Sequence, residues 1–279
     1  MRTISKIVIA AVFLAAFLSH AEVATAGSLE EASAEVKRLY MEGNYTEARA
    51  AAAKALEMAR EKHGSDGLPV TGALEDMAMI AGAEGKHGEA AGLYKGAIEI
   101  YEKRLGPEDN MVAATSITIG DLYYKAAQNE DAEACYGRAI AIYRKNLGER
   151  DARLGDAIDK LAELYYMQGK YNEAETLYEE SLKIRENIFG RHNVELTFAL
   201  GRLSELYYFH RKYDKAEAVC KQWLDISEDT HKEDSPYMAA PLTSLAEIYK
   251  AEGKYNLAAP RYEAAIELQK RILGRIIRG

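Results

Sequence analysis

Residues 164–174 read Leu-Tyr-Tyr-Met-Gln-Gly-Lys-Tyr-Asn-Glu-Ala, and the chain repeats this stretch at a constant interval. Similar stretches occur at 206–216 and 248–258, each 42 residues after the previous one. Equal steps toward the N-terminus reach three weaker copies, so that six copies follow one another in register. They end at Ala48, Ala90, Ala132, Ala174, Ala216 and Ala258. A fixed period of this length indicates an array of stacked repeats.

The fourth copy shows the pattern of a helix pair. Ile158, Leu161 and Tyr165 have the spacing of one apolar helix face. Gly169 follows, and glycine is the usual residue where a helix ends in a left-handed turn. A second and longer periodic run then continues until Gly190. No segment alternates with period two over the length of a strand, so we predict an all-α protein.

These residues resemble the tetratricopeptide repeat (TPR), a helix-turn-helix unit. The matching positions are Leu161, Ala162, Tyr165, Gly169, Tyr171, Ala174, Tyr178 and Ser181. The 42-residue period, the long second helix and the Leu-Gly-Pro at 105–107 resemble the kinesin-light-chain-like subtype. The resemblance covers about residues 28–274 and implies a right-handed superhelical solenoid of about six repeats. It also implies a protein-interaction surface and no catalytic activity, because such repeats are mostly binding scaffolds.

Residues 1–26 have the features of a secretory signal peptide. Arg2 and Lys6 precede an apolar run of 12 residues at 7–18, and Ala24-Thr25-Ala26 is a small-x-small cleavage site. A membrane-spanning helix needs about 20 apolar residues, so this run is too short to span a bilayer. We therefore expect an exported protein, periplasmic or secreted, without stable membrane insertion after cleavage. The alternative is an uncleaved N-terminal anchor.

The rest of the chain, 27–279, is predicted to form one TPR domain. Ser28 and Glu31 have the spacing of a capping box, which places the first helix directly after residue 28. The predicted repeats lie at about 29–71, 72–113, 114–155, 156–197, 198–239 and 240–279.

Composition and motifs argue against several functions. The net charge of −8 is unfavourable for nucleic-acid binding, which requires a basic surface. The Gly-Lys pairs of the repeat lack the remaining residues of a phosphate-binding loop. The histidines have no metal-ligand spacing. We therefore predict no enzyme, no catalytic residues, no metal and no cofactor.

One constellation lies opposite the core face of the predicted first helices. Positions 163 and 166 share that face, and their equivalents in neighbouring repeats are also acidic or tyrosine. This predicted partner-binding set is Asp121, Tyr124, Glu163, Tyr166, Glu205, Tyr208 and Glu247. A row of carboxylates beside tyrosines would suit a basic or aromatic-containing protein or peptide. The alternative is that these residue types simply favour a solvated helix surface.

The two cysteines are not predicted to form a disulfide. Cys135 and Cys220 lie two repeats apart, whereas bridged cysteines have Cα atoms within about 7 Å. Cys220 occupies the position that Tyr136 and Tyr178 hold in other repeats.

Two functions remain open at this stage. The first is an exported interaction scaffold that binds a protein or peptide, with the concave face as the candidate surface. The second is a self-associating structural or assembly subunit of an envelope complex. The sequence leaves the oligomeric state and the partner undetermined.

Signal cleavage is directly testable. We expect N-terminal sequencing of the exported protein to begin at Gly27, because the cleavage site ends at Ala26. A sequence that begins at Met1 would instead show the uncleaved anchor.

Overall fold

The computed structural model describes residues 28–230 and 238–276. Its Cα positions group into two compact units, divided between Thr115 and Ser116. The predicted signal peptide lies outside the described residues, and the single domain predicted for 27–279 stays a prediction. The described residues contain α-helices and short 3-10 turns, with no strand. No helix among them is long and apolar enough to cross a membrane.

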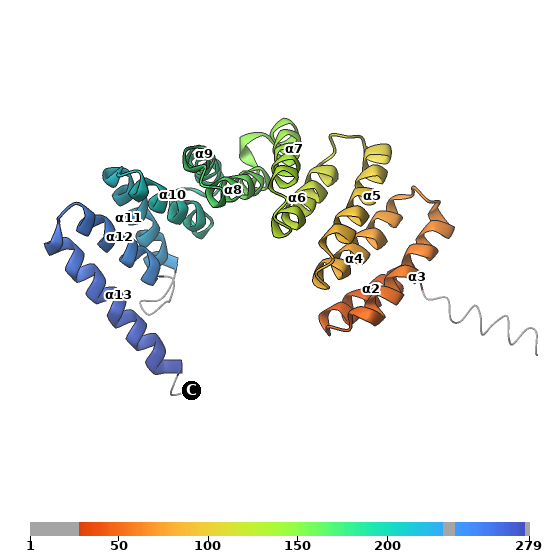
Figure 1. The fold of residues 1–279 in the computed structure, drawn as a ribbon, viewed down its shortest axis with the longest axis horizontal. Helices are drawn as coiled ribbons and strands as arrows, with labels where there is room; N and C mark the ends of the chain where they lie inside the picture. The colour runs from red at the N-terminus through yellow and green to blue at the C-terminus, as the bar shows by residue number, and fades with distance from the viewer. Residues whose placement is uncertain (1–27, 231–237, 277–279) are drawn as a thin grey trace, which may run out of the picture. The chain divides into compact units, whose positions relative to one another are not determined.

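The helices alternate between a first and a second member of each repeat (Figure 1). The first helices are α2 (Leu29–Met41), α4 (Leu68–Ala83), α6 (Asn110–Lys125), α8 (Ala152–Met167), α10 (Thr197–Phe209) and α12 (Ala239–Ala251). The second helices are α3 (Tyr45–His63), α5 (His87–Leu105), α7 (Asn129–Leu147), α9 (Tyr171–Phe189), α11 (Tyr213–Thr230) and α13 (Tyr255–Ile276). Two 3-10 turns, η1 (Gly148–Arg150) and η2 (Val194–Leu196), precede α8 and α10.

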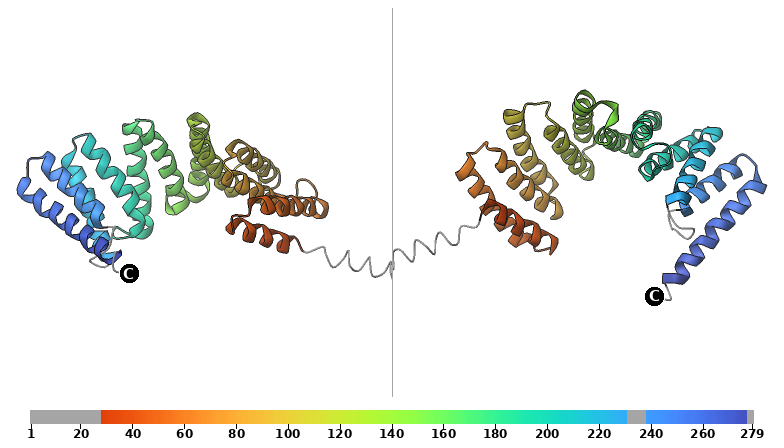
Figure 2. Two further views of the ribbon diagram at one scale, coloured as in Figure 1. Left: turned by 60° about the horizontal axis from the view of Figure 1, so that its bottom comes forward. Right: turned by 180° about the vertical axis from the view of Figure 1, so that it is seen from behind.

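Within each unit, consecutive helices pack against each other. In the first unit α4 packs on both α3 and α5, and in the second α8 packs on α7 and α9. Figure 2 shows the same side-by-side arrangement for α12 and α13 in both views. These stacked helix pairs confirm the predicted all-α repeat fold.

The alanines that end each repeated stretch lie where two helices meet. Five of them, from Ala48 to Ala216, have no exposed surface, and Ala258 is 3% exposed. In the second unit Ala174 and Ala216 join Tyr178, Leu203 and Leu206 in one apolar core. Small side chains at these points allow the paired helices to approach closely, as the repeat pattern predicts.

The ends of the helices follow local chemistry. Ser28 accepts a hydrogen bond from the Glu31 backbone, and Glu31 accepts one from the Ser28 backbone, which confirms the capping box. Between the two helices of a pair, the chain adopts positive φ, usually at glycine. Ala127 and Arg211 adopt it too, at φ 57° and 55°, although a side chain disfavours this conformation.

The strained turns predict a stabilising substitution. Ala127→Gly should raise the free energy of unfolding by about 1 kcal/mol, because glycine reaches positive φ without the Cβ clash. The matched reverse change is Gly169→Ala, at φ 75°, where an added Cβ would meet no other atom within 4 Å. Urea denaturation should move the two midpoints in opposite directions; a shift in the same direction would contradict the argument.

The close helix contact at Ala174 predicts a destabilising substitution. Ala174→Leu should lower the free energy of unfolding by about 1–3 kcal/mol, because the larger side chain overpacks the contact. The exposed Asn187 lies on the same helix. Its replacement by alanine should change stability by less than about 0.5 kcal/mol. Equal denaturation midpoints for the two variants would argue against the contact.

Candidate functional site

The predicted partner-binding residues lie on the first helices of the second unit. Asp121 and Tyr124 belong to α6, Glu163 and Tyr166 to α8, Glu205 and Tyr208 to α10, and Glu247 to α12. Because each residue recurs at the same position of its helix, the set forms rows across successive repeats.

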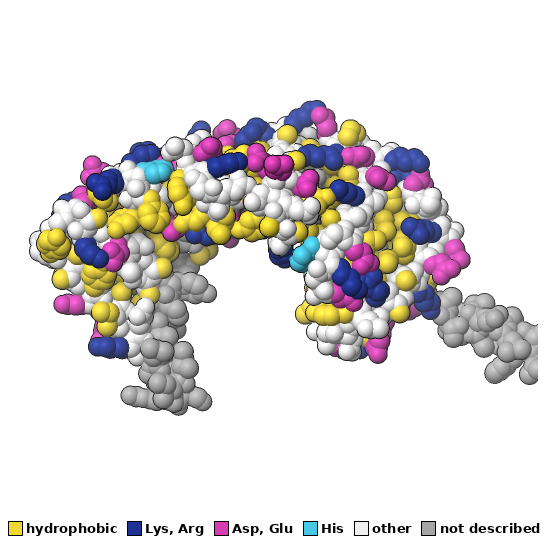
Figure 3. All heavy atoms as spheres, viewed as in Figure 1, with side chains coloured by type: hydrophobic (Ala, Val, Ile, Leu, Met, Phe, Trp, Pro, Cys, Tyr) yellow, Lys and Arg dark blue, Asp and Glu magenta, His cyan; other side chains and the backbone are white. Residues whose placement is uncertain are grey.

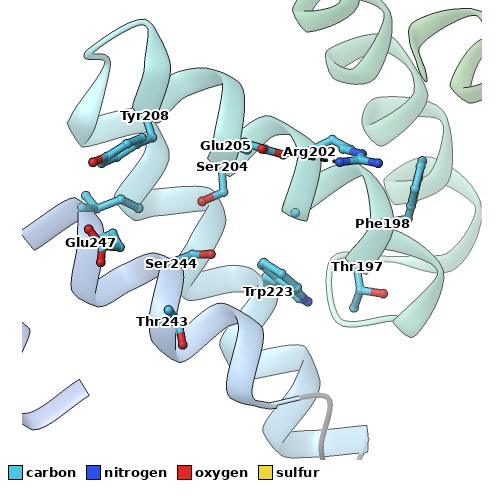
Figure 4. A pocket seen from close by; sticks show the side chains of 12 residues that line it. Thr197, Phe198, Arg202, Ser204, Glu205, Tyr208, Trp223, Thr243, Ser244 and Glu247 are labelled. Carbon is cyan, nitrogen blue, oxygen red and sulfur yellow. Dashed lines mark hydrogen bonds and ion pairs between the residues drawn. The ribbon is translucent and has the colours of Figure 1, made fainter. Parts of the chain in front are cut away.

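A pocket of about 490 Å³ brings three of these residues together. Glu205, Tyr208 and Glu247 line it, together with nine residues of α10, α11 and α12 (Figure 4). Asp121, Tyr124, Glu163 and Tyr166 are outside its lining. The predicted set is thus divided between this pocket and the adjoining helix face.

The pocket has distinct ends and a mainly apolar lining. Figure 4 shows Tyr208 and Glu247 at one end and Phe198 with Arg202 at the other. Trp223 reaches in from α11 and closes one side. Its ring lies against Gly201, where an added Cβ would be 3.3 Å away. A pocket of this size and character is suited to an apolar group that also carries a few polar atoms.

Tyrosines of the second helices bind three of the predicted acids. Tyr136 donates to Asp121 at 2.7 Å and Tyr178 donates to Glu163 at 2.7 Å. Tyr262 donates to Glu247 in the same way. Burial and the bond to the acid raise the pKa of the Tyr136 and Tyr178 hydroxyls far above the usual value. These bonds fasten the second helix of each pair to its first helix.

Basic side chains also neutralise the row. Lys160 lies 2.9 Å from Asp121, and Lys250 lies 3.1 Å from Glu247. Arg202 contacts Glu163 at 2.7 Å and Glu205 at 3.4 Å. The row is therefore a set of ion pairs, and its negative field is weaker than four isolated carboxylates would give.

Arg202 is a structural part of the pocket wall. Its guanidinium lies over the Tyr166 ring at 5.0 Å and over the Phe198 ring at 5.7 Å. These cation–π contacts and the bond to Glu163 hold the arginine in place.

A chain of aromatic contacts continues from the pocket to the turns. Tyr208 packs on Phe209 at 5.9 Å, Phe209 on Tyr171 at 6.5 Å, and Tyr171 on Tyr166 at 5.6 Å between ring centroids. Phe209 is 57% exposed and Tyr171 is 41% exposed. Figure 3 shows hydrophobic side chains gathered at the surface over this part of the second unit. Exposed apolar surface of this kind is typical of an interaction site.

Other charged clusters serve packing. Arg185 bonds Asp159 at 2.8 Å and Asp156 at 2.6 Å, and Arg185 and Asp159 are almost fully buried. Burial raises the pKa of Asp159, which Arg185 opposes. Within residues 28–230 and 238–276, no group of three His, Cys, Asp or Glu side chains is placed to hold a metal ion.

Sequence reasoning missed most of the pocket. Phe198, Trp223, Thr243 and Ser244 were not predicted, because they depart from the repeat pattern. Two features of the sequence could have indicated the pocket: Cys220 replaces the tyrosine of other repeats, and the chain has a single tryptophan.

Family models of the tetratricopeptide repeat match residues 37–67, 70–145, 154–222 and 211–271. The chain belongs to the tetratricopeptide repeat family. No curated protein matches the sequence.

Several solved structures share the TPR fold. BtubC (BKLC) from P. vanneervenii has 20% identity and a TM-score of 0.68, over 89% of this chain and 93% of that one. A putative kinesin light chain from Podosopora anserina, with nearly identical TPR-like repeats, has 21% identity and a TM-score of 0.61, over 71% and 94%. PilF of Pseudomonas aeruginosa has 16% identity and a TM-score of 0.57, over 88% and 97%. At these identities the likeness shows the fold alone.

The tyrosine–acid bonds predict a cost for removing one hydroxyl. Tyr178→Phe should lower the free energy of unfolding by about 1.5–3 kcal/mol, since the lost bond involves a charged acceptor. Tyr255→Phe is the matched control, because Tyr255 is 68% exposed and its hydroxyl is accessible to water. Urea denaturation of both variants checks this expectation, and equal stabilities would refute it.

Proposed function

We propose that this protein is an exported, non-enzymatic scaffold that binds a protein or peptide partner through the first-helix face of the second unit. The pocket between α10, α11 and α12, with the exposed aromatic residues beside it, carries the proposal. TPR proteins generally mediate protein–protein interactions, which supports the broader class. The signal-like start of the sequence supports export to the periplasm or the extracellular space.

The chemistry of this face favours a basic or aromatic segment. Tyr208 and Trp223 offer large contact areas, and such residues carry much of the energy of protein interfaces. Glu205 and Glu247 at the pocket remain 39% exposed even though both are paired. Their carboxylates would orient a cationic partner and favour its approach more than they would add affinity.

A second candidate is self-association through the last helix. On α13, Tyr255 is 68% exposed and Ile266 50%, and their spacing of 11 residues, about three helical turns, places both on one face. An apolar helix face of this kind suits a second copy of the chain, as an assembly subunit requires. Sedimentation distinguishes the two candidates: a monomer at tens of micromolar argues against self-association.

Binding to a partner should depend on the first-helix face. A partner would first be captured from the exported fraction, and its affinity would then be measured for designed variants. Tyr208→Ala should weaken binding at least about tenfold, chiefly through faster dissociation. Glu247→Gln should instead flatten the salt dependence of association.

The control for this experiment is Glu173→Gln, an exposed position on the second helix α9. It should bind as the unchanged protein does. A partner that binds all four proteins alike would show that another face makes the contact.

A further inference from the structure

One position of the second helix differs between repeats in a way that bears on the pocket. Tyr136, Tyr178 and Tyr262 occupy equivalent positions, and each donates its hydroxyl to the acid 15 residues earlier. In the repeat between the last two, the equivalent residue is Cys220. A tyrosine that fills space and bonds an acid in three repeats is therefore missing from the repeat that carries Cys220.

The surroundings of Tyr178 show which space is concerned. Its ring contacts Phe198 at 6.0 Å between centroids, and its hydroxyl bonds Glu163, which also binds Arg202. One repeat further on, these three neighbours are replaced by Ala240, Glu205 and Ser244, respectively. The bulky ring pair of one repeat therefore becomes a cysteine and an alanine in the next.

The pocket adjoins this space, and Cys220 lies buried behind its lining. Glu205 and Ser244, which correspond to the two residues at the Tyr178 hydroxyl, both line it. Ser204, the equivalent of the Ala162 that packs in the same core as Tyr178, lines it as well. In Figure 4 the side chains of Ser204 and Ser244 extend into the space above Trp223. The pocket thus opens next to the position where other repeats place their own tyrosine.

We propose that this pocket receives a tyrosine side chain from the partner protein, with its ring beside Trp223 and its hydroxyl donating to Glu205. This inference rests on the proposed function and names the chemistry of that partner. The apolar lining suits the ring, and a carboxylate is the acceptor that the tyrosine hydroxyl finds in three other repeats.

Glu205 has acceptor capacity for this bond. Its contact with Arg202 is long, at 3.4 Å, and its side chain is 39% exposed. A carboxylate offers about four acceptor positions, so one more donor can be accommodated. Asp121 and Glu247 each combine a tyrosine hydroxyl with a basic side chain in the same manner.

The chain supplies its own reporter for the pocket. Trp223 is the only tryptophan of the protein, so its fluorescence reports on this one site. N-acetyl-tyrosinamide, titrated into the full chain, should produce a saturable change in that fluorescence. N-acetyl-phenylalaninamide should bind about five- to tenfold more weakly, because it lacks the hydroxyl. Equal affinities, or no saturable change with the tyrosine probe, would overturn the proposal.

Restoring the missing tyrosine should close the pocket. Cys220→Tyr combined with Ser204→Ala rebuilds the Tyr178–Ala162 pair and should weaken binding of N-acetyl-tyrosinamide at least about tenfold. Cys220→Ala, which leaves the space open, should bind the probe as the unchanged protein does. Ser244→Phe narrows the pocket from α12 and should also lower the affinity for N-acetyl-tyrosinamide. This variant tests the pocket if the double variant does not fold.

The outcomes separate this inference from the proposed function. Probe binding that survives in the folded double variant, or in Ser244→Phe, would place the probe elsewhere and refute the tyrosine pocket. A captured partner whose binding is sensitive to Tyr208→Ala but unaffected by closing the pocket would uphold the scaffold and refute only the tyrosine. Loss of partner and probe together on closing the pocket, with Cys220→Ala unaffected, would establish both.

Discussion

The close approach of two helices at a buried alanine is the contact on which each repeat depends. Ala174 has no exposed surface, and the residues around it include Tyr178 and Leu203. Because the contact is so close, the tyrosine of the second helix reaches the acid on the first-helix face opposite the core residues. Helix packing at the alanine thereby positions the tyrosine–acid hydrogen bond. The acids that were predicted for partner binding also link the two helices.

The fold could be predicted from the sequence because its determinants are local and repeated. Glycine or its substitutes at the turn, alanine at the contact and the helical periodicity recur at every step. The ion pairs were not predictable in this way. Arg202 meets Glu163 across 39 residues, and Lys160 meets Asp121 across the same distance. Periodicity shows that two residues share a face, but it does not show which cation reaches which acid in the neighbouring repeat.

The proposed binding pocket lies where the array departs from its repeat. Residues that recur, such as Tyr178, stabilise the repeat. Tyr178 is fully buried, and its hydroxyl already bonds Glu163. Residues that occupy their repeat position in one repeat only, such as Trp223, Phe198 and Cys220, distinguish the pocket from the equivalent sites of the other described repeats. In our proposal, the loss of one large side chain gives this array of similar units a distinct binding position.

Cys220 also has a consequence for redox chemistry. The proposed export would bring the chain into oxidising surroundings, where an exposed thiol would form mixed disulfides. The Cys220 side chain has no exposed surface, its sulfur donates to the Pro241 carbonyl at 3.2 Å, and burial raises its pKa to about 12. Because the thiolate is the reactive species, this thiol is chemically inert while the repeat is folded. Its alkylation by a thiol reagent would therefore follow the opening of α11 and α12, which makes Cys220 an intrinsic marker of local unfolding at the pocket.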